Sequence, residues 1–142
     1  MDRRAFVLAS ASLLAAPRAL ALSSTEVALV TADLESRLVV VELATGRGLR
    51  HVATLPKPRS IEAVGHVAVA AHSELGAVSL IRAPSLRVSH VLRGFGEPRY
   101  TAGHPDGRHA YVSDAKRGEV VTLDVLRGRV LDARVSARRH GT

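Results

Sequence analysis

Short apolar runs separated by polar turns fill the chain from about residue 27 onward. Val, Ile, Leu and Thr dominate these runs, and such residues fit the pleated, buried surface of a β-strand. Turn residues such as Asp106-Gly107 and Gly128 stand between the runs, as expected for tight connections between antiparallel strands. No segment after the N-terminal region shows helical periodicity flanked by capping residues. The pattern therefore predicts an all-β chain.

The apolar runs repeat with a period near 40 residues. Three copies of the pattern align, and Arg59, Arg99 and Arg139 mark the same position in successive copies, 40 residues apart both times. Such a period, with four short strands per repeat, is typical of β-propeller blades, which are arranged around a central channel. The sequence therefore predicts a partial β-propeller over residues 22–142, with about two and three-quarter four-stranded antiparallel blades.

Each blade is expected to contain four strands, A to D, from the channel outward. The first copy lacks strand A, and a fourth copy begins at Arg139 and stops. The expected strands are Val27–Thr31, Leu38–Leu43 and Leu49–Thr54 in the first copy, Arg59–Val64, Val67–Ala71, Ala77–Arg82 and Arg87–Leu92 in the second, and Arg99–Gly103, His109–Ser113, Glu119–Asp124 and Val130–Val135 in the third.

The first 21 residues differ from the repeats and have the features of an export signal. Arg3-Arg4-Ala5-Phe6 precedes a weakly apolar stretch from Ala5 to Ala16, which is too short to span a bilayer. Ala19-Leu20-Ala21 has the small-x-small form that signal peptidase accepts, and the paired arginines resemble a twin-arginine signal. We therefore expect a signal-peptide helix in residues 1–21 and a mature chain from Leu22. We expect that mature chain to have no stable membrane span and to be periplasmic or secreted.

Composition narrows the possible chemistry. The chain has no cysteine, which excludes disulfides, zinc–thiolate sites and thiol nucleophiles. The net charge is +7, but the arginines are scattered and the chain has only two Tyr, two Phe and no Trp, so a nucleic acid is not an expected partner. Because there is no His-x-His pair, no His-x-x-x-His pair and no Gly-x-Ser-x-Gly segment, we predict no metal site, no cofactor and no catalytic residues.

The third copy resembles the YVTN-type β-propeller repeat. Tyr111-Val112-Ser113-Asp114 stands where that family has its Tyr-Val-Thr-Asn tetrad, and Pro105-Asp106-Gly107 matches the turn between its strands. The likeness covers about residue 27 to the end and is strongest over 97–129, whereas the first two copies depart from the tetrad. The resemblance implies the fold but no particular activity, because propeller blades host many functions.

The resemblance also implies a ring of about seven blades, within the range of four to eight known for propellers. Fewer than three blades cannot close such a ring. We therefore expect the chain to be a truncated product or a fragment of a longer protein. Its terminal blades would then present open sheet edges, which favour aggregation.

Strand direction places the start of each strand A and the end of each strand B on one rim of the propeller. The candidate ligand-binding residues at this rim are Arg59, Arg99, Arg139, Tyr100, His140, His72 and Asp114. Guanidinium groups bind anions through planar, bidentate hydrogen bonds, so the expected partner is an anionic small molecule or a protein. The same side chains would also serve as links between blades, and their repetition favours that structural role.

These observations favour a non-catalytic binding or assembly scaffold over an enzyme. The alternative is a lactonase-like hydrolase, because Pro98-Arg99 followed by a His-Pro-Asp-Gly turn is similar to lactonase-type propellers, which use Arg, His and Glu at the channel. Tyr100 stands where that family has His, and Ser113-Asp114 replaces its Asn-Glu. A third hypothesis, a propeller that handles haem or quinone, follows from the twin-arginine signal alone and has no axial-ligand arrangement in the sequence.

Overall fold

The computed structural model describes residues 5–8, 25–32 and 34–135. This part of the chain forms three four-stranded antiparallel sheets, ordered β1-β2-β3-β4, β5-β6-β7-β8 and β12-β11-β10-β9. Strands that follow one another in the chain are hydrogen-bonded neighbours, which is the meander of a propeller blade. The predicted all-β fold with a four-stranded repeat is therefore confirmed. We call the three sheets blades 1, 2 and 3 in chain order.

The strands agree closely with the repeat pattern. From residue 27 onward, every expected boundary lies within one residue of the observed one. A single turn of 3-10 helix, Ser73–Leu75, joins β6 to β7. The strands are β1 Ala5–Leu8, β2 Val27–Ala32, β3 Arg37–Glu42, β4 Gly48–Ala53, β5 Ser60–Val64, β6 Val67–His72, β7 Ala77–Arg82, β8 Arg87–Arg93, β9 Pro98–Gly103, β10 His109–Asp114, β11 Glu119–Asp124 and β12 Arg129–Val135.

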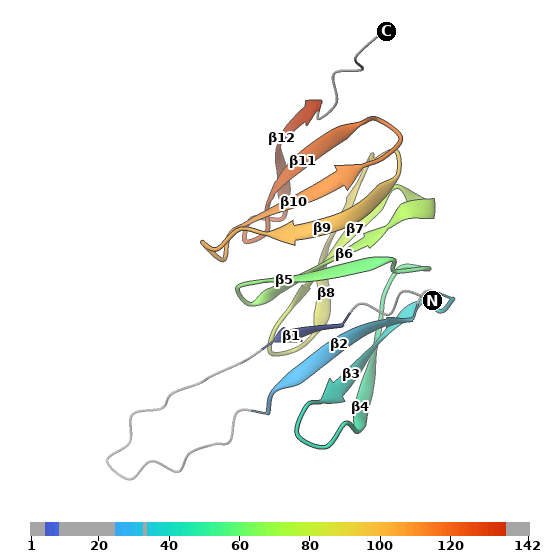
Figure 1. Ribbon diagram of the computed structural model, residues 1–142, viewed down its shortest axis with the longest axis vertical. Coiled ribbons are helices and arrows are strands. Elements are labelled where there is room, and N and C mark those ends of the chain that lie inside the picture. Colours follow the sequence, from blue (N-terminus) through green and yellow to red (C-terminus); the bar gives the residue numbers. More distant parts are fainter. Residues whose placement is uncertain (1–4, 9–24, 33, 136–142) are drawn as a thin grey trace, which may run out of the picture.

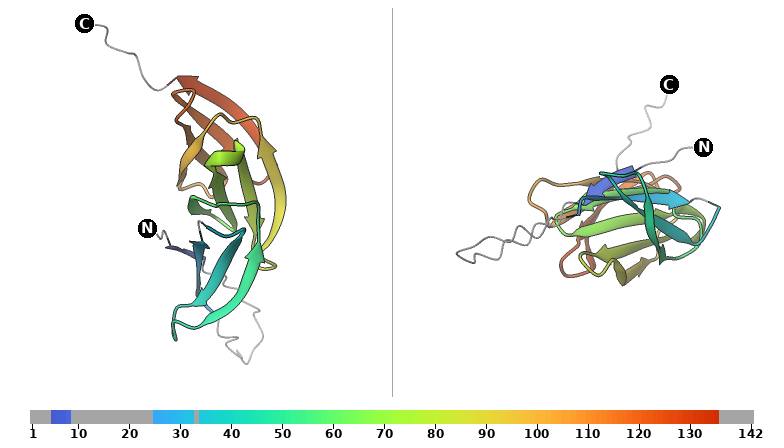
Figure 2. Two further views of the ribbon diagram at one scale, coloured as in Figure 1. Left: turned by 90° about the vertical axis from the view of Figure 1, so that its right-hand side faces the viewer. Right: turned by 90° about the horizontal axis from the view of Figure 1, so that it is seen from below.

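The three blades follow one another along the long axis of the molecule, from β1–β4 at the bottom to β9–β12 at the top (Figure 1). Strand β5 contacts both β1 and β9, the innermost strands of the other two blades. Seen from the side, the blades form an arc (Figure 2). The outer strands β4 and β8 are largely exposed along their length. This is the arrangement of neighbouring blades in a propeller.

Two apolar clusters join the blades face to face. One cluster lies between blades 1 and 2 and the other between blades 2 and 3. The first contains Leu29, Leu38, Val40, Val52, Ile61, Ala68, Ala70, Ile81 and Leu86. The second contains Val64, Val67, Val69, Val78, Leu80, Phe95, Ala110, Val112, Val121, Leu123 and Val125. Fully burying one Val or Leu side chain stabilises a fold by roughly 1.5–3 kcal/mol, so these clusters are the main source of cohesion.

Blade 2 is covered on both faces, and the side chains on both faces of its strands are therefore buried. Alternate residues of a strand point to opposite faces, so Val67 and Val69 of β6 join one cluster while Ala68 and Ala70 join the other. All six residues of β6 are buried as a result. This explains why the second copy is a continuous apolar run, whereas β10 in the third copy alternates between buried and half-buried residues.

Strand β1 corrects one expectation. The repeat pattern predicts no strand A in the first copy, but Ala5–Leu8 pairs antiparallel with β2, in register from Ala5 opposite Val30 to Leu8 opposite Val27. An apolar segment can take this place because a strand edge accepts any chain through its backbone groups. These four residues belong to the stretch expected to be a signal-peptide helix, and over them that helix is wrong. The rest of residues 1–21 lies outside the described residues, and the signal peptide itself stays a prediction.

The turns between the two inner strands of blades 2 and 3 touch each other. Gly65 has φ +57°, and a Cβ added to it would lie 2.8 Å from the backbone oxygen of Gly107. Only glycine adopts this conformation without strain and without a side chain in the contact. The approach therefore depends on glycine at residue 65.

In the part of the chain that the structure describes, no helix is long and apolar enough to cross a membrane.

Candidate functional site

The starts of β5 and β9 lie at the same rim as the ends of β6 and β10, as the strand directions predict. We call this edge the strand-start rim and the opposite edge, formed by the β5–β6, β7–β8, β9–β10 and β11–β12 turns, the turn rim. The predicted site residues found on the strand-start rim are Arg59, Arg99, Tyr100, His72 and Asp114. Arg139 and His140 lie outside the described residues, so the third position of the arginine series stays a prediction.

The two described arginines of this rim have different surroundings. Nη2 of Arg99 lies 2.6 Å from Oε1 of Glu97, and its Nε donates to the same oxygen at 2.8 Å. Both side chains are more than a third exposed, so this ion pair contributes at most about 1 kcal/mol. Arg59 is exposed, and among the described residues no hydrogen bond or ion pair involves its guanidinium group. Arg59 therefore presents its charge to solvent.

Tyr100 lies on the innermost strand of blade 3 and is 49% exposed. Its backbone N–H donates to the Ser113 hydroxyl at 3.1 Å, which ties β9 to β10 where their register shifts. The ring is therefore held on a fixed backbone at the surface of blade 3, where it is accessible to a partner.

His72 is fully buried, unlike the surface residue that a ligand rim requires. Its Nδ1 lies 3.0 Å from the carbonyl oxygen of Pro56, and its Nε2 lies 2.8 Å from the hydroxyl of Ser79. A carbonyl can only accept, so Nδ1 carries the proton and Nε2 accepts from the Ser79 hydroxyl. Burial lowers the pKa of His72, against the opposing effect of the Pro56 hydrogen bond. The imidazole is thus neutral and structural.

The Ser79–His72 pair has the hydrogen bond that activates a serine nucleophile, but not its setting. In a serine hydrolase the hydroxyl is accessible and a carboxylate orients the imidazole. Here both side chains are completely buried, and the carbonyl of Pro56 takes the place of the carboxylate. The pair therefore anchors the segment before β5 onto β6 and β7, and this geometry gives it no route to a substrate.

Asp114 is also buried, and its carboxylate is used by the backbone. It accepts from the N–H groups of Gly96 at 2.6 Å, Glu97 at 2.9 Å and Arg117 at 3.2 Å. Burial alone would raise the pKa of this carboxyl, but the three N–H donors and the nearby Arg117 charge outweigh it and lower the pKa. Asp114 thus fixes the link between blades 2 and 3 as well as the β10–β11 turn.

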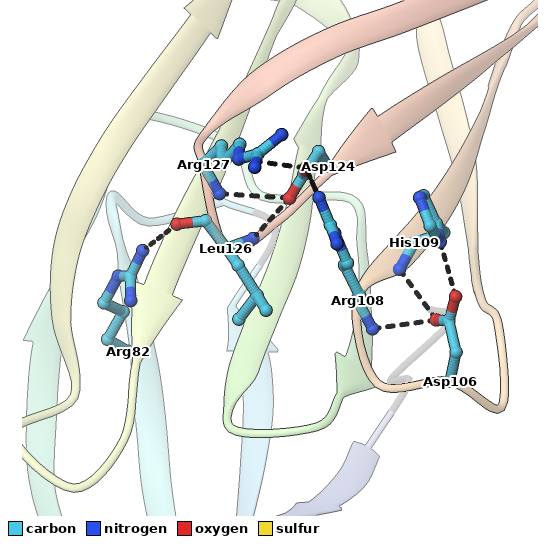
Figure 3. A network of polar contacts seen from close by, with 7 residues as sticks. All are labelled: Arg82, Asp106, Arg108, His109, Asp124, Leu126 and Arg127. Carbon is cyan, nitrogen blue, oxygen red and sulfur yellow. Dashed lines mark hydrogen bonds and ion pairs between the residues drawn. The ribbon is translucent and has the colours of Figure 1, made fainter.

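Asp124 holds the β11–β12 turn on the turn rim, as Asp114 holds the β10–β11 turn on the strand-start rim. Asp124 is not among the site residues that the sequence predicts. Figure 3 shows its carboxylate between Arg108, Leu126 and Arg127. One oxygen accepts from Nη2 and Nε of Arg108 at 2.9 and 3.2 Å, and the other accepts from the backbone N–H groups of Leu126 and Arg127. The hydrogen bond from Arg108 is the main reason why the pKa of Asp124 is lowered.

Links between blades through arginine occur on the turn rim. Arg82 of blade 2 donates to the carbonyl oxygen of Leu126 in blade 3 at 2.6 Å (Figure 3). Arg50 of blade 1 donates to the carbonyl oxygen of Ser85 in blade 2 at 2.7 Å. In each case, a guanidinium group reaches the β7–β8 or β11–β12 turn of the following blade. The sequence favours Arg59, Arg99 and Arg139 as links between blades. Among the described residues, Arg50 and Arg82 make such links instead.

A histidine–aspartate cluster occupies the β9–β10 turn. Asp106 accepts from the backbone N–H groups of Arg108 and His109, and its other oxygen lies 2.5 Å from Nδ1 of His109. The hydrogen bond from His109 is the largest of the effects that hold the pKa of Asp106 well below its usual range. His104 lies 3.2 Å from the same carboxylate. Within the described residues, no three His, Asp or Glu side chains are grouped closely enough to hold a metal ion.

Comparison with known proteins supports the fold. No family model matches the chain, and no curated protein matches it. Among solved structures, it is similar to hydrazine synthase of Kuenenia stuttgartiensis, with a TM-score of 0.70 and 17% identity over 75% of this chain and 32% of that one. It is also similar to the dihydro-heme d1 dehydrogenase NirN in complex with DHE, with a TM-score of 0.67 and 18% identity over 78% of this chain and 26% of that one.

A third similar structure, U3-55K, has a TM-score of 0.67 and 11% identity, over 78% of this chain and 36% of that one. All three are β-propeller proteins. At such low identity the likeness shows the fold alone. The chain spans between 26% and 36% of the length of these structures, so what each of them does says nothing by itself about this chain.

Proposed function

We propose that this protein is an exported β-propeller scaffold that binds a partner at the strand-start rim and catalyses no reaction. The observation that carries this proposal is the commitment of His72 and Asp114 to the fold. Both are buried, and every hydrogen bond described above joins them to groups that hold strands and turns together. A catalytic acid or base must instead reach a substrate proton.

The accessible residues of the same rim favour recognition. Arg59 is exposed and Arg99 is partly exposed beside Glu97, while the half-exposed ring of Tyr100 adds an apolar surface. Arginine and tyrosine are enriched where proteins contact partners, because both combine apolar area with hydrogen-bonding groups. The partner that this chemistry fits is an anionic group, either on a small molecule or on a protein surface.

Binding at the rim is testable by titration with a simple anion. We expect inorganic phosphate or citrate to shift the NMR signal of the Arg59 side chain, and Arg59→Gln to abolish the shifts of neighbouring amides. The matched control is Arg129→Gln, since Arg129 is an exposed arginine on the outermost strand of blade 3. Equal shifts at Arg59 and Arg129 would mean only general charge attraction and would contradict a rim site.

The absence of catalysis has its own test. Purified protein is incubated with a panel of lactones and simple esters over a range of pH, and no turnover above that of a heat-denatured sample is expected. Turnover that Arg99→Gln abolishes, while the far-UV circular dichroism stays unchanged, would overturn the scaffold proposal and favour the lactonase-like alternative.

Export rests on the N-terminal sequence. Mass spectrometry of protein recovered from the periplasm or medium is expected to give a chain that starts at Leu22, and Arg3→Lys with Arg4→Lys is expected to stop its export. Protein that keeps Met1 and stays in the cytoplasm would contradict this part of the proposal.

A further inference from the structure

The stack of blades ends in two faces that no other blade covers among the described residues. Each blade has a leading face, turned toward the next blade in the chain, and a trailing face, turned toward the preceding one. Both contacts within the stack place a leading face on a trailing face. The uncovered pair, the leading face of blade 3 and the trailing face of blade 1, is therefore of complementary kinds.

The trailing face of blade 1 has the residues of a blade contact. Ala28, which is 5% exposed in the single chain, stands at the position of Ala68 in blade 2 and Ala110 in blade 3, both of which are fully buried against the preceding blade. A small residue in the middle of the face lets the larger side chains of a leading face pack onto it. Val39 and Val41 of β3 lie on the same face and are half-buried.

The leading face of blade 3 supplies the other half. Tyr111, Val120 and Thr122 stand at the positions of Val69, Val78 and Leu80 in blade 2. Those three residues of blade 2 are fully buried under blade 3, whereas their counterparts in blade 3 are only half-buried. None of the three counterparts is charged. The charged side chains opposite Val120 and Thr122, Arg134 and Asp132, lie on the outer strand β12 and pair with each other, both exposed, so another blade can cover the inner part of the face without burying an unpaired charge.

We infer that the leading face of blade 3 packs on the trailing face of blade 1 of a second copy of this chain, so that two copies close a six-bladed ring. A second copy fits these faces because the new contact would repeat, position by position, the two contacts already present within the stack. One head-to-tail pair covers all four free faces at once, as a heterologous contact does when its rotation closes. Six blades also fall within the range in which propellers close.

Sedimentation of the purified chain, with and without residues 1–21, tests the inference, because the contact residues named above lie on β2, β3, β10 and β11. We expect a species with twice the mass of the single chain, which is 15.1 kDa for all 142 residues, and this species should not grow further as the concentration rises. Val39→Glu on the trailing face of blade 1 and Thr122→Lys on the leading face of blade 3 should each shift the chain toward monomer at least tenfold. The matched control is Val91→Glu on the outer strand β8 of blade 2. Val91 belongs to neither of the two uncovered faces and is 37% exposed, so this variant should leave the dimer intact.

Mixing the two variants gives a test that loss of folding cannot imitate. In a mixed pair, one contact is of the original kind, and the other places the introduced ammonium group of Thr122→Lys against the introduced carboxylate of Val39→Glu. Dimers should therefore return on mixing and weaken with salt. A monomer at all concentrations would overturn the inference, as would a series of ever larger assemblies. Failure of the mixture to restore dimers, with both variants folded by circular dichroism, would overturn it as well.

Discussion

At the scale of single residues, the polar groups of the strand-start rim divide into buried ones that hold the fold and exposed ones that a partner can reach. His72 and Asp114 are completely or almost completely buried, and Arg59 is exposed. The two roles follow position in the repeat. Both described residues at the end of strand B, His72 and Asp114, are buried, whereas Arg59 and Arg99 at the start of strand A are exposed or partly exposed.

His72 makes the stability depend on pH. Burial places its pKa below the ordinary value of 6.5, so the unfolded chain takes up a proton near that pH and the folded chain does not. The free energy of unfolding should therefore fall as the pH drops below about 6.5. Urea titrations between pH 8 and pH 5 measure this slope, and His72→Gln should reduce it.

The pH dependence of stability that His72 causes can be separated from the pH dependence caused by the buried carboxyls. The carboxyls with lowered pKa, such as Asp114 and Asp124, lose their contribution only as the pH falls through their folded pKa, below the ordinary value of 3.8. His51→Gln, which replaces an exposed histidine on β4, is the matched control for the substitution. If His72→Gln and His51→Gln had the same slope, the neutral buried imidazole would be excluded.

Asp114→Asn is expected to destabilise the protein by about 2 kcal/mol, because it removes the charge that three backbone N–H groups share and leaves buried donors poorly satisfied. Asp132→Asn is the control, since the Asp132 side chain is 49% exposed and pairs with Arg134 on the outer strand. Thermal unfolding of both variants measures the difference. Equal losses would show that the buried position of Asp114 does not matter.

Some of these roles could be predicted from the sequence and others could not. The common rim of Arg59, Arg99, His72 and Asp114 was predictable, because strand direction alone determines which ends share an edge. The burial of His72 was not predictable, because its partner Ser79 stands where the third copy has Val121, inside an otherwise apolar run, and nothing in the pattern pairs the two side chains. No sequence signal indicated which buried polar side chains would meet.

At the scale of the element, the glycine turns join blades as well as strands. Gly65→Ala should cost more stability than a positive φ alone explains, because the new methyl group would approach the Gly107 backbone oxygen. Gly118→Ala is a matched control, with φ +64° and nothing within 4 Å of the added carbon. Conformational strain costs both variants about 1–2 kcal/mol, so chemical denaturation should show a further loss for Gly65→Ala only. Equal losses would contradict the contact between the turns.

The strand boundaries were predictable because alternation and turn residues are local signals. Strand β1 was not, because four apolar residues in a stretch that resembles a signal peptide carry no repeat pattern. Its pairing with β2 depends on a free strand edge far along the chain. If residues 1–21 are removed on export, blade 1 keeps β2, β3 and β4, and the edge of β2 becomes available.

At the scale of the whole molecule, the period of 40 residues predicts the number of blades, and the burial of each copy reflects its place in the stack. Blade 2 is the most continuously apolar copy because both of its faces are covered. Among the described residues, blades 1 and 3 each pack against one other blade. The sequence could not show what lies against the free faces, since their residues are compatible with solvent and with another blade.

Three propeller blades stack face to face, with blade 2 in the middle. Hydrogen exchange measured at each backbone amide reports on this arrangement, because protection follows burial and local stability. The amides of β6 and β7 should exchange most slowly, and those of β4 and β12 fastest. Equal protection of all three blades, or slower exchange in β12 than in β6, would contradict the stacked arrangement.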